Sequence, residues 1–509
     1  MLAAFVASIA VGCGGGGGMG DGTPTGPPPR GTLLQTPPDL VSTVTAGTLL
    51  QELSVAANGQ LLTLGGIPLC DIGIYHIEYE TVGGANEATS ASAALMVPAG
   101  VDPRCRGGRP ILLYAHGTTT NKAFNIANLD DPDNAEGLLL AAFFASQGYI
   151  VVAPNFAGYD ISTLPYHPYL IADAQSKDMI DALVAARKAL PLAGALVTRD
   201  GGGLFITGYS QGGYVALATH RALQALGQPV TASAPMSGPY ALAAFVDALF
   251  EGEVNEDATV TSAFLITAYQ HAYGNVYTTA TDVFEPAYAT GIDTLLPTTT
   301  ARSQLYAEGK LPESALFSST APATAYAAMT PATTPTLLAP VFANGFGSGN
   351  LITNAYRLTY LNDAIQNPDG GFPALTTGLP AAAPAVTLRQ ALKTNDLRNW
   401  SPAAPVLLCG GANDPTVYWL NAELMANYWA EQSPAPSATS ILDLEASTSG
   451  SPYAALHTGF EAAKTAVAVA AIAGGATDGG AAAVADAYHT TLVAPFCLAA
   501  VVEFFGSQP

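Results

Sequence analysis

A short apolar segment runs directly into a glycine-rich motif in the stretch LFITGYSQGG, residues Leu204–Gly213. The first half has the composition of a β-strand, and the second half contains G-x-S-x-G with Ser210 at its centre. This layout is typical of a sharp strand-to-helix turn that lifts a serine hydroxyl above a parallel sheet. Glycine makes up 52 of the 509 residues, so the five-residue pattern alone is weak evidence.

The residues on either side of the motif supply the specificity. Apolar side chains recur at helical spacing at Val215, Ala218, Ala222 and Leu226. Gly227 then provides a helix stop. Glycines around Ser210 let the helix and the strand approach closely at a strained serine backbone. The sequence therefore predicts a nucleophile elbow at Ser210; the alternative is a glycine-rich turn with an incidental serine.

Strand-like and helix-like segments alternate on both sides of this motif. Strands are predicted at 110–115, 149–154, 203–207, 230–235 and 405–409, and helices at 138–145 and 172–190. Earlier in the chain, residues 49–98 alternate between apolar and polar and predict antiparallel edge strands. Alternation of strands and helices implies a mostly parallel sheet flanked by helices. We therefore expect an α/β protein of the α/β-hydrolase fold.

The regular alternation is lost between about residues 239 and 401. This segment is too apolar and aromatic for a disordered linker, and helices are predicted at 242–250 and 260–273. We expect a large, mainly helical cap or lid over the catalytic face; a separate domain with no part in the site is the alternative. The predicted divisions are a leader and tether at 1–31, the cap at 239–401, and two core parts at 32–238 and 402–509.

The charge balance argues against several classes of partner. The chain has 17 Lys and Arg against 39 Asp and Glu, a formal net charge of −22. Nucleic acid and anionic membrane surfaces are therefore poor partners for the protein as a whole. No apolar run of about 18 residues follows the N-terminus, so no internal membrane span is expected. No cysteine or histidine cluster has metal-ligand spacing, so we expect no metal. We also expect no other cofactor and a monomeric protein.

The N-terminus has the features of an export signal. Residues 1–12 form a short apolar segment, and Ala10–Cys13 resembles a lipobox. A glycine tract and a proline-rich stretch follow to about Gly31. The sequence predicts a protein that is secreted from, or anchored to the envelope of, a bacterial cell. Cys13 is either a lipid-anchored residue on a flexible tether or part of an ordinary signal peptide.

Four cysteines remain when Cys13 is set aside, and they allow three pairings. We favour Cys70–Cys105 with Cys409–Cys497, because this arrangement joins N-terminal strands to each other and a core strand to the last helix. Buried free thiols are the alternative, and they are the less expected state in an oxidising compartment.

A nucleophilic serine needs a base, and the base needs an orienting carboxylate. In hydrolases of this layout the chain order is serine, acid, histidine. Asp414 is the predicted acid because it stands in the loop after the strand at 405–409. The alternative role for Asp414 is to cap the following helix. Asp443, inside the next predicted strand, is a weaker candidate for the acid.

Two histidines follow the predicted acid. His489 directly precedes the predicted last helix at 490–505, the expected position of the base, so we assign it that role. His457 follows the predicted strand at 441–444 and is the alternative base. Whichever histidine is not the base is expected at the surface or at the rim of the pocket.

Acyl transfer also needs two backbone donors for the oxyanion. One is expected from the amide of Gln211, directly after the serine. The other is expected from Gly117 or Thr118, in the loop after the strand at 110–115. The alternative for this loop is a plain strand-ending turn. Asp160 either lines the pocket or caps a helix.

With these residues in place, the chain resembles the secretory-lipase family of α/β-hydrolases. The resemblance rests on GYSQGG at 208–213, on HGT at 116–118, on the Asp414 loop and on the large insertion before that loop. It implies hydrolysis of carboxylic esters, including acylglycerols, beneath a mostly helical lid and without a cofactor. It also implies that Ser210, Asp414 and His489 are the nucleophile, acid and base.

Three functions are consistent with the sequence. The leading hypothesis is a secreted serine esterase or lipase that works through an acyl-enzyme. An exopeptidase or other amide hydrolase on the same triad is the second, and comparing ester with aminoacyl-amide substrates separates it from the first. The third is a surface binding protein that keeps the fold without the chemistry. Labelling by a fluorophosphonate probe would argue against the third.

Overall fold

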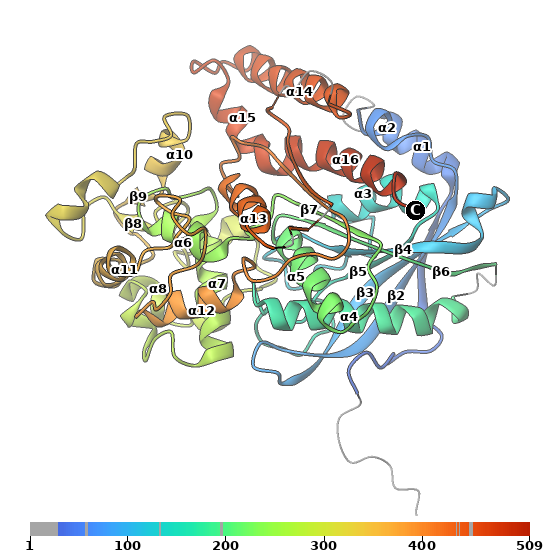
Figure 1. Ribbon diagram of the computed structural model, residues 1–509, viewed down its shortest axis with the longest axis horizontal. Coiled ribbons are helices and arrows are strands. Elements are labelled where there is room, and N and C mark those ends of the chain that lie inside the picture. The colour runs from blue at the N-terminus through green and yellow to red at the C-terminus, as the bar shows by residue number, and fades with distance from the viewer. Residues whose placement is uncertain are drawn as a thin grey trace, which may run out of the picture.

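The computed structural model describes residues 29–55, 60–131, 134–193, 197–433, 435–436, 438–446 and 451–509. In these residues a nine-stranded sheet has the order β1-β2-β3-β5-β4-β6-β7-β10-β11. Helices lie on both faces of the sheet (Figure 1). The predicted leader at 1–31, with Cys13, lies almost entirely outside the described residues.

The sheet combines an antiparallel edge with a parallel centre. Its strands are β1 Asp39–Val44, β2 Asp71–Val82, β3 Ala88–Ala99, β4 Gly107–Ala115, β5 Ile150–Pro154, β6 Thr198–Tyr209, β7 Ala232–Met236, β10 Val406–Gly410 and β11 Thr439–Asp443. The pairs from β1 to β3 and the β3–β5 pair are antiparallel, and every pair from β5 to β11 is parallel. The fully buried strands β5 and β10 are apolar along their whole length, as strands covered on both faces are. This arrangement confirms the predicted α/β-hydrolase fold.

The flanking helices bury their apolar side chains against the sheet. One face is covered by α4 (Ala172–Ala189) and α5 (Gln211–Ala225), which pack on each other. On the other side α16 (Ala494–Gly506) contacts β7, β10 and α3 (Ala135–Phe143). The remaining core helices are α13 Leu420–Ala430, α14 Ala454–Ala473 and α15 Ala481–Ala487.

Several predicted boundaries were wrong. Strand β6 begins at Thr198 rather than at 203, and β4 begins at Gly107 rather than at 110. Residues 49–55 and 60–65 belong to helices α1 (Ala46–Val55) and α2 (Gln60–Gly65) rather than to edge strands. The buried side chains of α1, Leu49 and Leu53, are four residues apart, which is helical spacing. The last helix begins at residue 494 instead of 490, because a π-helical turn at Tyr488–Val493 precedes it.

One helical stretch of the described chain, Ala481–Gly506, is long and apolar enough to cross a membrane by length and composition. Inside the protein, 67% of its most apolar window is buried. Burial of this extent is what a core helix of the hydrolase fold shows, and α16 packs directly on the central strands.

Between β7 and β10 the chain leaves the sheet and forms a mainly helical region, which we call the insertion (residues 239–401). Its elements are α6 Leu242–Phe250, α7 Ala258–Tyr273, α8 Pro286–Ala289, α9 Arg302–Ala307, α10 Ala339–Asn344, α11 Asn354–Gln366, α12 Thr387–Asn395 and the short strands β8 Phe317–Ser318 and β9 Phe346–Gly347. The insertion lies at one end of the molecule (left in Figure 1). The helices predicted at 242–250 and 260–273 are confirmed as α6 and α7.

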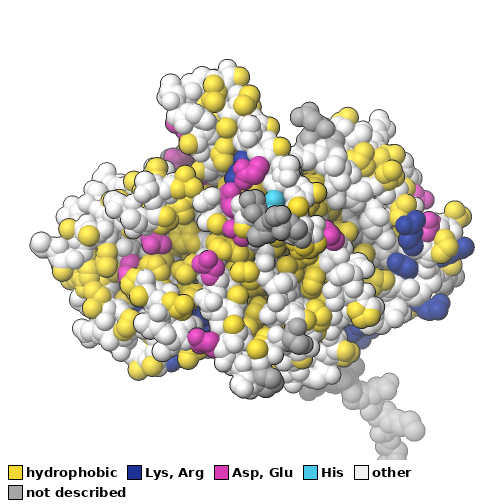
Figure 2. Space-filling view, turned by 45° about the horizontal axis from the view of Figure 1, so that its top comes forward, with side chains coloured by type: hydrophobic (Ala, Val, Ile, Leu, Met, Phe, Trp, Pro, Cys, Tyr) yellow, Lys and Arg dark blue, Asp and Glu magenta, His cyan; other side chains and the backbone are white. Residues whose placement is uncertain are grey.

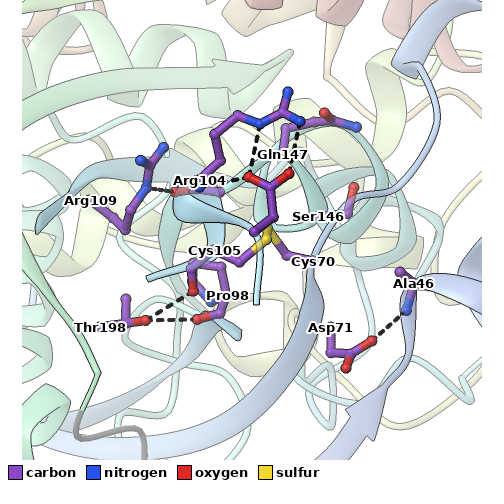
Figure 3. Close-up of a disulfide and its surroundings, with 12 residues drawn as sticks. Ala46, Cys70, Asp71, Pro98, Arg104, Cys105, Arg109, Ser146, Gln147 and Thr198 are labelled. Carbon is purple, nitrogen blue, oxygen red and sulfur yellow. Dashed lines mark hydrogen bonds and ion pairs between the residues drawn. A yellow bond between two sulfur atoms is a disulfide. The ribbon is translucent and has the colours of Figure 1, made fainter. Parts of the chain in front are cut away.

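Two disulfides are present, with the pairing favoured from the sequence. Cys70–Cys105 joins the residues before β2 to the turn before β4 (Figure 3). Cys409–Cys497 joins β10 to α16. The second bridge therefore fixes the strand that precedes Asp414 to the helix that follows His489.

Candidate active site

Ser210 occupies a strained turn between β6 and α5. Its φ of 58° and ψ of −122° lie in a region that few residues other than glycine adopt. A Cβ atom on Gly212 would lie 1.9 Å from the Ala115 carbonyl oxygen, and one on Gly208 would lie 2.3 Å from the Gly212 oxygen. Because neither position has room for a side chain, the G-x-S-x-G pattern follows from the close packing of this turn.

Ser210, His489 and Asp414 form one hydrogen-bonded row. His489 Nε2 lies 2.9 Å from Ser210 Oγ, and His489 Nδ1 lies 2.7 Å from Asp414 Oδ2. The other carboxylate oxygen of Asp414 accepts the backbone N–H groups of Thr416 and Val417, each at 2.9 Å. His489 and Asp414 are buried, at 5% and 1% exposure, whereas Ser210 is partly exposed. With its proton on Nδ1, the imidazole can accept the serine proton at Nε2.

The structure holds His489 by its backbone as well as by its ring. The Tyr209 hydroxyl, directly before the serine, donates to the His489 carbonyl oxygen. The neighbouring Tyr488 hydroxyl donates to Glu445 at 2.7 Å. Irregular π-helical turns are frequent at functional sites, and this one turns the His489 ring toward Ser210.

The alternative residues lie elsewhere. His457 is buried in α14, where its Nδ1 lies 3.2 Å from the Leu444 carbonyl oxygen, and it does not line the cavity described below. The expectation that the remaining histidine lies at the surface or at the rim of the pocket was therefore wrong. Asp443 accepts the N–H groups of Ala412 and Glu445 at 2.9 and 3.0 Å, as a turn residue does. The structure therefore brings neither His457 nor Asp443 into the row that contains Ser210.

The predicted oxyanion donors differ in whether their N–H groups already have an acceptor in the structure. The Gly117 N–H donates to both oxygens of Glu136, at 2.9 and 3.2 Å. Among the described residues, the N–H groups of Thr118 and Gln211 have no acceptor. The arrangement thus favours Thr118 over Gly117 as the partner of Gln211. His116, the first residue of the predicted motif, is buried, and this burial lowers the pKa of its ring to about 4.

Glu136 is a site residue that the sequence does not reveal. It stands in the first turn of α3, where acidic residues are common for reasons of helix stability alone. Its carboxylate accepts a 2.5 Å hydrogen bond from the Tyr114 hydroxyl in addition to the Gly117 N–H. Burial raises the pKa of Glu136. The Glu136 carboxylate fixes the loop that carries Thr118.

Ser210 and His489 line a cavity of about 660 Å³. The insertion lines it mostly with aliphatic and aromatic side chains, among them Leu242, Phe245, Val246, Leu249, Val260, Leu265 and Ile266. Arg302 and Asp257 also line the cavity, and they form an ion pair with each other. Such a cavity suits an apolar group beside the serine.

Asp160 does not line this cavity. Its carboxylate lies 2.7 Å from His76 Nε2 and accepts a 2.5 Å hydrogen bond from Ser92. No group of three or more His, Cys, Asp or Glu side chains within the described ranges is arranged to hold a metal ion.

No protein-family model and no curated protein matches the sequence. Solved structures match its fold. The rice cell wall degrading esterase LipA from Xanthomonas oryzae is 25% identical, with a TM-score of 0.63 over 86% of this chain and 96% of that one. A protein from Legionella pneumophila, thought to be a hydrolase, is 21% identical, with a TM-score of 0.57 over 81% and 91% of the two chains. Lipase A from Candida antarctica is 12% identical, with a TM-score of 0.46 over 79% and 75%.

Proposed function

We propose that this chain, which has the fold of the lipase-like α/β-hydrolases, is a serine hydrolase that cleaves carboxylic esters through an acyl-enzyme. The observation that carries the proposal is the row of Ser210, His489 and Asp414, with distances of 2.9 and 2.7 Å, at an apolar cavity. The row has the geometry of an activated nucleophile, and the cavity offers a place for an acyl chain.

The proposed reaction has two halves. Ser210 Oγ attacks the ester carbonyl carbon while His489 Nε2 takes the hydroxyl proton. The negative charge that forms on the carbonyl oxygen is stabilised by the N–H groups of Gln211 and Thr118. His489 then gives its proton to the departing alcohol, which leaves the acyl group on Ser210. In the second half His489 takes a proton from water as the water oxygen attacks the acyl carbon. The bond to Ser210 Oγ then breaks while His489 returns the proton to that oxygen, which releases the carboxylic acid and restores Ser210.

Asp414 has a separate part in both halves. When His489 gains a proton it becomes an imidazolium buried beside the Asp414 carboxylate, and the 2.7 Å contact stabilises that charge. The two backbone N–H groups on the other oxygen of Asp414 hold the carboxylate in place. Asp414 thus orients the base and keeps its tautomer.

Esters are favoured over peptides by the lining of the cavity. An exopeptidase must bind a charged terminus of its substrate, whereas Arg302 and Asp257 in this cavity are already paired with each other. The similar protein from Xanthomonas oryzae is a cell wall degrading esterase, which supports the same reaction class here.

We also propose that the insertion is a cap over the site, between core parts at 32–238 and 402–509. Its side chains form much of the cavity wall beside Ser210, which supports this role. The two disulfides support an oxidising, extracytoplasmic location. A monomer that needs no cofactor remains our expectation.

The proposal is tested on p-nitrophenyl esters of increasing acyl length. Ser210→Ala and His489→Ala should each lower kcat by about 10⁴-fold or more, because the row acts as a unit. His457→Ala is the matched control, since it removes a buried histidine outside the row, and it should keep most of the turnover. Thermal unfolding of each variant separates lost chemistry from lost fold.

Fluorophosphonate labelling provides an independent measurement. The wild-type protein should be labelled on Ser210, and Ser210→Ala should not. Full ester turnover by folded Ser210→Ala, or absence of labelling in the wild type, would exclude the proposed mechanism. Faster cleavage of aminoacyl amides than of esters would favour an exopeptidase instead.

A further inference from the structure

Four arginines gather where strands β4 and β6 begin, at the end of these strands opposite to Ser210. Arg104, Arg106 and Arg109 lie in or just before β4, and Arg199 is the second residue of β6. The two strands pair here, with Gly108 opposite Arg199. Figure 2 shows Lys and Arg side chains clustered at one end of the molecule, away from the insertion. Such a cluster stands out in a chain with 17 basic and 39 acidic residues.

Most of this positive charge is not neutralised locally. Arg104 pairs with Asp102 at 3.0 Å, whereas Arg109 donates to the Gly148 carbonyl oxygen at 2.8 Å (Figure 3). Within the described residues, no carboxylate lies within ion-pair distance of Arg106, Arg109 or Arg199. Arg106 and Arg199 are exposed to solvent.

Large apolar side chains are exposed in the same two loops. Val101 is 88% exposed, more than any other large apolar side chain of the described chain, and Val197 is 64% exposed. The loops lie side by side, because the Thr198 hydroxyl contacts the carbonyl oxygens of Pro98 and Cys105 at 2.9 and 3.2 Å. Exposed valines and unpaired arginines therefore share one surface, which we call the basic end.

Several described residues of the basic end are fixed by covalent or hydrogen bonds. The Cys70–Cys105 disulfide crosses beneath it, and Arg109 is fixed to the loop before β5 (Figure 3). The Gly107 N–H donates to the Val197 carbonyl oxygen at 2.7 Å, and this hydrogen bond joins the two loops where β4 and β6 begin. A partner that binds here does not have to order the surface first.

We propose that the basic end docks on an anionic lipid bilayer, with Val101 and Val197 entering the headgroup layer and the arginines contacting lipid phosphates. Apolar side chains flanked by basic ones are the pattern of a surface that lies in a membrane interface. Each basic side chain near an anionic leaflet strengthens binding by about fivefold. The proposal does not depend on the proposed enzyme activity.

The net charge of −22 does not prevent this contact. At physiological salt, charges are screened over about 8 Å, so acidic residues at the far end of the protein contribute little. The overall charge argued against membranes for the molecule as a whole, whereas the basic end presents a local excess of positive charge. Within the screening distance, the charges of the basic end itself determine whether it is attracted to an anionic bilayer.

The proposed contact also sets an orientation. Strand β6 starts in the basic end at Thr198 and finishes at Tyr209, beside Ser210. At about 3.3 Å per residue, this strand places Ser210 roughly 40 Å from the bilayer.

Vesicle co-sedimentation tests the proposal, with the full chain carrying Ser210→Ala so that lipid esters stay intact. Binding should be strong to phosphatidylcholine vesicles that contain about a third phosphatidylglycerol, at least tenfold weaker to pure phosphatidylcholine, and lost at about 1 M salt. Equal binding to both vesicle types, or none to the anionic ones, would overturn the proposal.

Single substitutions locate the surface. Arg106→Glu and Arg199→Glu should each weaken binding to anionic vesicles by about tenfold, and Val101→Asp should weaken it as well. Lys310→Glu is the matched control, because this exposed lysine makes the same charge change in the insertion and should leave binding unchanged. Equal losses for Arg106→Glu and Lys310→Glu would refute a local surface. Dimers in light scattering that Val101→Asp dissociates, without vesicle binding, would identify a second copy as the partner instead.

Discussion

The sheet core and the insertion are held together by different interactions. The core packs apolar strands between helices and contains both disulfides. The insertion shares the apolar core and adds buried arginines: Arg389 pairs with Asp247 and Asp363, and Arg398 pairs with Asp369 and Asp396. Among the described residues, ion pairs between an arginine and an aspartate that are both nearly fully buried occur only in the insertion.

The difference shows two ways of fixing the walls of the cavity beside Ser210. The core positions Ser210, Asp414 and His489 at strand and helix ends that cannot move without breaking the sheet. The insertion is packed through apolar side chains as well, and its buried charge pairs add directional contacts to that packing. The Arg398 guanidinium donates hydrogen bonds to the carboxylates of Asp369 and Asp396 and to the Gly378 carbonyl oxygen. The Arg398 side chain has no solvent exposure.

The largest predicted effect on stability is at Arg398. Arg398→Met leaves Asp369 and Asp396 buried without a counter-charge and should lower the free energy of unfolding by about 3–5 kcal/mol. Chemical denaturation measures this change. The triple variant Arg398→Met, Asp369→Leu and Asp396→Leu is the control, and it should recover much of the loss because no charge is left buried. A loss below about 1 kcal/mol for Arg398→Met would mean that the charges do not hold the insertion.

The next effect is at the core disulfide between Cys409 and Cys497. Replacing both cysteines by serine should cost about 2–4 kcal/mol and lower ester turnover, because the bridge joins the strand before Asp414 to the helix after His489. The matched control replaces Cys70 and Cys105, whose loop spans 35 residues rather than 88. We expect the control to lose about 0.8 kcal/mol less stability and to keep its turnover. Equal losses of turnover in the two double variants would contradict a link between the Cys409–Cys497 bridge and the site.

The smallest effect is a dependence of stability on pH, which we expect from three glutamates where the insertion meets the loop after β10. Burial raises the pKa values of Glu251, Glu253 and Glu256 to about 7 each. The folded protein holds these protons where the unfolded chain has lost them, so stability should fall as the pH rises from about 4.5 to 7. The triple Glu→Gln variant should show a smaller fall between pH 5 and 8 in denaturation experiments. An unchanged pH profile would show that these side chains do not destabilise the junction.

The core was largely predictable from the sequence because its signals are local. A strand, a glycine turn and a helix are contiguous around Ser210, and the order of serine, acid and histidine follows from the fold they imply. The disulfide pairing followed from the same strand assignment. The helix α1 was missed because its apolar residues also alternate over a few positions, and only Leu49 and Leu53 mark the helical face.

The insertion and parts of the site have no such local signal. Asp247 and Arg389 are 142 residues apart and pair only after folding. Glu136 looks like any acidic residue in the first turn of a helix until the Gly117 loop is placed against it. The π-helical turn that carries His489 is held by the hydroxyl of Tyr209, the last residue of β6, which donates to the His489 carbonyl oxygen. Such features are set by long-range packing.

Strand β6 has one further consequence if the protein sits on a membrane as proposed. Its start would face the lipid, and its end lies beside Ser210, the proposed nucleophile, so the membrane contact and the proposed active site would lie at opposite ends of this strand. The ester bonds of the lipids beneath the protein would then stay out of reach of Ser210. Esters that arrive from solution would reach the end of the protein that holds Ser210. The direction of β6 would thus keep the proposed active site away from the lipid esters of the membrane on which the protein sits.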